Sequence, residues 1–148
     1  MADIVSAATG IGGALLGTAV GAFVTHLLQR RNASFARLHE ERILAYVAFA
    51  EAVMEFRREL MDRWFAEHNG AAHDSSPVYA SRSTMWTAYY RVALLARDEG
   101  IRQAATAARE TVSSIKKAQS LDVMKARSDA TREAVRRFVD TARAEVSQ

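Results

Sequence analysis

The sequence contains no cysteine and only one proline, Pro77. Without cysteine the chain has no disulfide framework, no thiolate zinc or iron–sulfur site and no cysteine nucleophile. Few runs show the Val/Ile/Thr alternation typical of strands, whereas Ala, Leu, Arg and Glu, which favour helices, are abundant. The composition therefore predicts an all-α protein.

Lysine and arginine are absent from the first 29 positions, where Asp3 is the only side chain with a fixed charge. The remainder of the chain holds all 20 Lys and Arg against 16 Asp and Glu. The two signs alternate along this part of the sequence, as they do on solvated helix faces with i,i+4 pairs. No one-sided basic stripe is visible, so we expect no nucleic-acid partner.

The segment from Ile4 to Leu28 is apolar and holds five of the seven glycines. As a helix, its 25 residues would extend roughly 37 Å at ~1.5 Å per residue, enough for a hydrocarbon core of ~30 Å. Glycine is costly inside a water-exposed helix but is tolerated in a membrane. The pattern predicts a transmembrane anchor at residues 1–29, followed by a helical bundle at residues 30–148.

The flanking charges predict the orientation of this anchor. Arg30, Arg31 and Arg37 follow the apolar segment, whereas only Asp3 and the α-amino group precede it. By the positive-inside rule, the amino terminus lies outside the inner (plasma) membrane and residues 30–148 lie in the cytoplasm. We expect Arg30 and Arg31 to contact lipid headgroups at the membrane interface.

Small residues follow one face of the predicted anchor. At about 100° per residue, five positions fall within an arc of about 80°: Ser6, Gly10, Gly13, Gly17 and Gly21. Small residues let membrane helices approach closely and associate. This contact face predicts a homo-oligomer formed through the transmembrane helix.

Three other interpretations of the segment are left open. A cleaved export signal lacks support, because no basic residue precedes the apolar run and the run is long for such a signal. A helix buried in a soluble protein would rarely be so rich in glycine. A pore lined by the segment has no charged residue to support it.

Residues 30–148 carry an apolar periodicity of three and four, which predicts amphipathic helices packed in an antiparallel bundle of three to four helices. The central stripe is Tyr46, Phe49, Val53, Phe56 and Leu60, broadened by Ile43, Val47, Ala50, Met54 and Met61. Later stripes comprise Ala105, Ala108, Val112 and Ile115, then Val135, Phe138, Val139, Ala142 and Val146. The expected breaks are Asn69-Gly70, Ser76-Pro77, Asp98 and Ser120.

Aromatic residues cluster in the second of these helices. Tyr79, Trp86 and Tyr90 share one face, which predicts that they pack in the core. Tyr89 points about a quarter-turn away from Tyr90, so we expect it at the edge of the bundle or against a partner.

No motif for catalysis, phosphate binding or metal binding occurs in the sequence. His68 and His73, with Glu67 and Asp74, are more easily explained as solvated loop residues than as a metal site. We therefore expect no catalytic, cofactor-binding or metal-ligating residue and no enzymatic activity.

The stretches "RILAYVAFAEAV", "YRVALLARDEGIRQAA" and "VRRFVDTARAEV" resemble small actinobacterial single-pass membrane proteins with a cytoplasmic helical region. The resemblance implies topology and fold, and no site residue. We expect a non-enzymatic interaction or scaffold module on a self-associating anchor, with membrane lipids and an unidentified protein as partners. A small membrane-perturbing protein, holin-like or phage-excluding, and a soluble helical ligand-binding protein are the alternatives.

Overall fold

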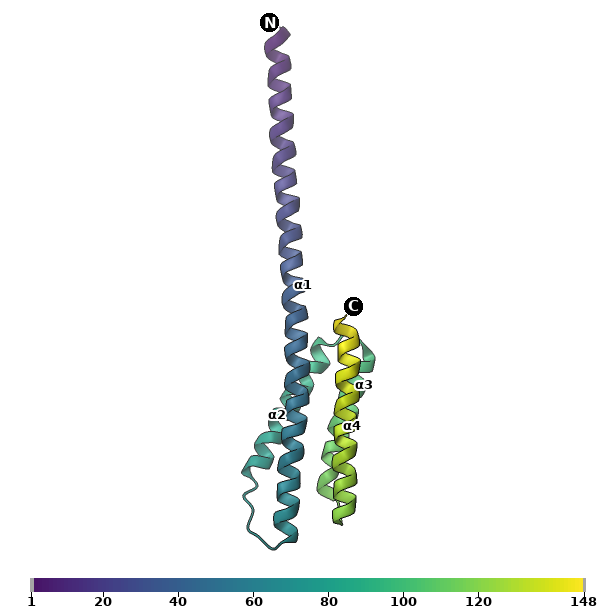
Figure 1. The fold of residues 1–148 in the computed structure, drawn as a ribbon. Coiled ribbons are helices and arrows are strands. Elements are labelled where there is room, and N and C mark those ends of the chain that lie inside the picture. Colours follow the sequence, from purple (N-terminus) through teal and green to yellow (C-terminus); the bar gives the residue numbers. More distant parts are fainter. Residues whose placement is uncertain (1, 148) are drawn as a thin grey trace. The chain divides into compact units, whose positions relative to one another are not determined.

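The computed structural model describes the backbone of residues 2–147 and the side chains of residue 29 and residues 33–147. In this part of the chain every regular element is helical, which confirms the all-α prediction for the described residues. The elements are α1 (Ala2–His68), α2 (Ser76–Leu95), α3 (Glu99–Ser114), the 3-10 helix η1 (Ile115–Lys117) and α4 (Leu121–Val146) (Figure 1).

The chain divides into two compact units, Met1–His39 and Glu40–Gln148. The predicted contact face and membrane-interface pair lie outside the side chains that the structure describes: Ser6, Gly10, Gly13, Gly17, Gly21, Arg30 and Arg31. Among the described residues, no helix has a stretch that is both long and apolar enough to span a membrane. The predicted division at residues 29 and 30 stays a prediction.

Within the second unit, α4 runs antiparallel to α1. The Tyr46 hydroxyl donates to Glu145 Oε1 at 2.8 Å near the end of α4. At the other end of the pair, Trp64 Nε1 donates to the Ala118 carbonyl at 2.9 Å, just before α4 begins. Contacts therefore run in opposite sequence order along the two helices.

The remaining helices continue the up-and-down order. Arg42 Nε donates to the Leu95 carbonyl at 2.7 Å, so the end of α2 lies beside the α1 residues that begin this unit. The hydroxyls of Tyr89 and Thr106 lie 3.0 Å apart and join α2 to α3. This arrangement confirms the antiparallel bundle, here with four helices.

The core follows the predicted central stripe of α1. Its five members are all buried: Tyr46, Phe49, Val53, Phe56 and Leu60. The predicted stripe of α3 and η1 is buried as well: Ala105, Ala108, Val112 and Ile115. Periodicity identified these faces correctly, because burial of an apolar stripe is what stabilises an amphipathic helix in a bundle.

Local capping residues set the helix ends. Asp98 accepts a hydrogen bond from the Gly100 amide and Ser120 accepts one from the Val123 amide, as the sequence predicts. Gly70, with a φ of 66°, ends α1 in the left-handed region. The N-cap of α2 is Ser75 and not Ser76, which is the first helical residue.

The prediction that Ile43 and Val47 of α1 lie in the core is wrong. Ile43 is 36% exposed and Val47 is 50% exposed. No other helix of the described chain covers this edge of α1, so the apolar face is wider than the core.

The aromatic assignment for α2 is wrong for Tyr79 and Tyr90, whereas Trp86 is half-buried and packs against the core as expected. Tyr79 and Tyr90, expected in the core, are 63% and 57% exposed. Tyr89, expected at the edge, is half-buried, with its ring centroid 6.1 Å from that of Phe49. α2 is therefore turned about its axis so that Tyr89 faces α1.

Polar groups join the helices around the Glu145 carboxylate. It accepts from the Tyr46 hydroxyl and, through Oε2, from the Asp98 amide at 3.1 Å. Burial, followed by this hydrogen bond to Glu145, raises the pKa of Tyr46. The carboxylate therefore ties α4 both to α1 and to the connection before α3.

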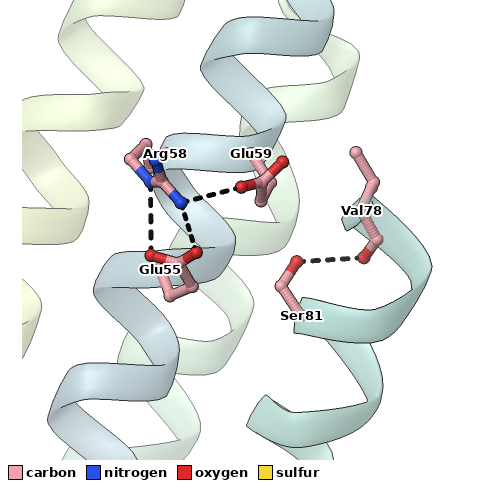
Figure 2. Close-up of polar contacts among 5 residues, drawn as sticks. All are labelled: Glu55, Arg58, Glu59, Val78 and Ser81. Atoms are coloured by element: carbon pink, nitrogen blue, oxygen red, sulfur yellow. Dashed lines mark hydrogen bonds and ion pairs between the residues drawn. The ribbon is translucent and has the colours of Figure 1, made fainter. Parts of the chain in front are cut away.

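One charged residue of α1, Arg57, is buried against α4. Its Nε donates to the Ser128 carbonyl at 3.3 Å, and burial lowers the pKa of its guanidinium. The exposed face of α1 is different, since Arg58 there lies between Glu55 and Glu59 (Figure 2). Such exposed pairs contribute little to stability.

We expect Tyr46→Phe to lower the free energy of unfolding by about 1 kcal/mol, because it removes a donor to a carboxylate without changing the packing volume. The matched control is Tyr79→Phe, at an exposed tyrosine without a recorded hydrogen bond in the described chain, and it should change stability little. Urea unfolding followed by circular dichroism measures both. Equal losses would contradict the assigned hydrogen bond.

The raised pKa of Tyr46 also predicts a pH dependence. The folded state holds this phenol proton more tightly than the unfolded chain, whose ordinary pKa is 10.0. The resulting stability is complete below that pH and is lost as the pH rises above it. Wild type should therefore lose stability more steeply above pH 10 than Tyr46→Phe, and parallel urea titrations would contradict this.

Candidate functional site

A groove with a volume of about 300 Å³ lies between α1 and α4. It is at the end of the bundle where α4 finishes. Eight of its ten lining residues are apolar or aromatic. The lining consists of Ile43, Tyr46, Val47, Ala50, Glu51, Phe138, Val139, Ala142, Arg143 and Val146.

Aromatic rings form the floor of the groove. The Phe138 ring packs edge-on against Tyr46, with centroids 6.0 Å apart, and against Phe49, with centroids 4.9 Å apart. Edge-to-face pairs of this kind add to the stabilisation that burial provides. The floor is therefore part of the hydrophobic core.

The walls are apolar residues that, apart from the buried Ala142, the fold leaves half-buried or exposed. On α1, Ile43, Val47 and Ala50 are separated by four and three residues. On α4, Val139 is 39% exposed, and Ala142 and Val146 follow it at spacings of three and four. This spacing is what a further helix needs to pack by knobs into holes.

Each wall also carries one charged residue. Glu51 lies on α1 and Arg143 lies on α4, both exposed. Neither has a recorded ion pair in the described chain. The groove thus combines an apolar centre with opposite charges on its two rims, the usual composition of a protein-binding surface.

The described residues hold no group of three or more His, Cys, Asp or Glu suited to a metal ion. The ring of His68 stacks on Trp64, with centroids 3.6 Å apart, and its Nδ1 lies 2.8 Å from the Trp64 carbonyl. These contacts of His68 are with Trp64, one turn earlier in α1, and not with a metal-binding group. The arrangement between α1 and α4 offers binding of an apolar helix face and no recognisable reaction chemistry.

The sequence did not reveal this groove. Its wall residues have the spacing of core residues, and only the packing of α4 against α1 shows which of them stay exposed. The unusual width of the apolar face of α1 was the one available signal.

A comparison with protein-family models matches residues 43–146 to the KilB plasmid transfer protein. The match covers more than half of the chain. The chain belongs to this family. Searches of curated proteins and of solved structures gave no match.

The KilB match runs from Ile43 to Val146, which are also the first and last residues that line the groove. The whole groove therefore lies within the residues that match the KilB family. The resemblance to actinobacterial single-pass membrane proteins stays a prediction, because the match says nothing of source or membrane.

We expect Val47→Ser and Val139→Ser each to lower the free energy of unfolding by no more than about 1 kcal/mol, because both side chains are already partly exposed. The control Phe138→Ala, in the floor, should cost about 3–5 kcal/mol. Urea unfolding compares them. Large losses from both valine variants would show that the walls belong to the folding core.

Proposed function

We propose that this chain is a non-enzymatic, membrane-anchored helical module that acts in plasmid transfer by binding a second copy of itself through the α1–α4 groove. The observation that carries the proposal is the groove, an exposed apolar surface on an aromatic floor. Exposed apolar surfaces of this kind on otherwise polar helices mark interaction sites.

The occupant that fits best is a second copy. A two-fold axis along the helices lays the α1 wall of one copy on the α4 wall of the other, so Ile43 and Val47 meet Val139 and its neighbours. The rims are complementary in charge, because the α1 wall is acidic at Glu51 and the α4 wall is basic at Arg143.

The proposed anchor supports this pairing. The apolar segment at residues 4–28 and the arginines after it favour insertion in the plasma membrane with residues 30–148 in the cytoplasm. Association through the small-residue face would hold two bundles close together. A groove of modest size then suffices, because tethering raises the effective concentration of its partner.

The description of the KilB family as a plasmid transfer protein supplies the process. A tethered bundle that pairs with a second copy of itself suits an assembly subunit in that process. The proposal assigns no reaction to the chain.

The absence of cysteine from the chain allows a direct test. We expect a full-length copy carrying Val47→Cys and a co-expressed full-length copy carrying Val139→Cys to form a disulfide-linked dimer in native membranes under mild oxidation, because the α1 wall of one copy lies on the α4 wall of the other. The control pairs Val47→Cys with Ser83→Cys, a nearly isosteric change at an exposed position of α2 away from the groove. Non-reducing electrophoresis reads both.

Adding Gly17→Ile to both copies should weaken the crosslink if the anchor brings the copies together. Equal crosslinking of Val47→Cys with Ser83→Cys and with Val139→Cys would overturn pairing through the groove. A crosslink from Val47 to a different protein would replace the second copy as its occupant.

A plasmid transfer assay tests whether the groove is needed for the proposed function. We expect Val47→Asp with Val139→Asp to lower transfer frequency about tenfold or more, since charges in an apolar contact cost well over 1.4 kcal/mol. Ser83→Asp, the matched surface charge, should transfer normally. Normal transfer by the double variant, at normal protein level, would contradict the proposal.

A further inference from the structure

A second hollow of about 380 Å³ lies at the opposite end of the bundle from the groove, where α1 and α3 end and α2 begins. One cationic side chain enters its lining from each of four elements: Arg63 of α1, Arg82 of α2, Arg109 of α3 and Lys116 of η1. None of its lining residues is acidic. The hollow is therefore positively charged.

These cations are only partly neutralised by neighbouring carboxylates. Arg63 pairs with Glu67 at 2.6 Å, and Arg109 makes a longer contact of 3.3 Å with Glu110. Arg82 and Lys116 are exposed and have no recorded ion pair in the described chain. Arg58, between two glutamates in Figure 2, shows how this chain neutralises an arginine elsewhere.

Arg109 is held in position by aromatic rings. Its guanidinium carbon lies 4.6 Å from the Trp86 ring centroid and 5.1 Å from that of Tyr89. Its Nε is buried and has no hydrogen-bond partner. The Arg109 side chain as a whole is 20% exposed, so the guanidinium that the rings hold in place still has accessible charged donors for an anion.

Helix dipoles do not explain this arrangement fully. Lys116 follows the carboxyl end of α3, where a cation is favourable. Arg82, however, lies in the second turn of α2, where the dipole does not favour a cation, and the first turn of α2 holds no acidic residue. Clustered like charges repel, and a bound anion would relieve that repulsion.

The positive region continues into a neighbouring hollow of about 280 Å³. The two share Leu60, Arg63 and Lys116, and the second adds Lys117 together with Trp64 and Glu67, the carboxylate that pairs with Arg63. The larger hollow also has an apolar wall, to which Phe56 and Val78 contribute, and the exposed ring of Tyr79 at its rim. Its chemistry suits a ligand with an anionic end and a planar or apolar end.

We propose that this basic hollow binds a phosphate-bearing small molecule of about mononucleotide size. The phosphate contacts Arg82, Arg109 and Lys116, which offer charged donors, and the ring lies on the apolar wall beside Tyr79. A volume near 380 Å³ suits one small ligand, since such sites span about 300–1,000 Å³. This site is separate from the groove, and neither depends on the other.

The test is calorimetric titration of the full-length chain with ADP, inorganic phosphate and glycerol 3-phosphate, the last representing a lipid headgroup. We expect saturable ADP binding, about tenfold or more tighter than either smaller anion, because only ADP also uses the apolar wall. Arg82→Gln with Lys116→Gln should weaken ADP binding by about tenfold or more, because two charged donors are lost.

The matched control is Arg91→Gln with Lys125→Gln. It makes the same change in charge at exposed positions outside the hollow, and it should leave ADP affinity within about twofold. Absence of saturable ADP binding overturns the proposal, as does equal weakening by the control pair. Tighter binding of glycerol 3-phosphate than of ADP also overturns it, in favour of a lipid headgroup.

Discussion

The packing of Phe138 of α4 against Phe49 and Tyr46 of α1 is the contact on which the rest of this structure depends. It joins helices that are far apart in sequence, with ring centroids 4.9 and 6.0 Å apart. The hydrogen bond from Tyr46 to Glu145 then fixes the end of α4 along α1. α4 packs on α1 through these aromatic rings. The neighbouring apolar residues Ile43, Val47 and Val139 are not covered by another helix of the described chain and form the walls of the groove.

The two surfaces at the ends of the bundle differ in chemistry. The groove beside Ile43 and Val146 is apolar, with one charge of each sign on its rims. The hollow at the other end is lined by four cations from four elements. The first suits a helix and the second suits a small anion, so we propose protein pairing for one and phosphate binding for the other. The KilB match contains the residues that line both surfaces.

Periodicity predicted what depends on a single helix: the central stripe of α1, the buried face of α3 and the caps at Asp98 and Ser120. Periodicity gave the wrong burial where the exposure of a side chain depends on how two helices pack against each other. Val47 has core spacing but no helix covers it, and α2 is rotated so that Tyr89 faces inward while Tyr90 faces solvent. The basic hollow could not be predicted, because its cations lie far apart in sequence and only the fold gathers them.

The central claim is that the groove pairs with a second copy, and the most direct measurement is a distance between copies. A single nitroxide on Val139→Cys, in the otherwise cysteine-free chain reconstituted in membranes, reports this distance by pulsed electron paramagnetic resonance. In the pairing each α4 packs on α1 of the other copy, with packed helices about 8–10 Å apart axis to axis. The two labels are therefore held at one fixed separation, and the account predicts one narrow distance population that Val47→Asp abolishes. A broad distribution, or a narrow one that Val47→Asp leaves unchanged, would contradict pairing through the groove.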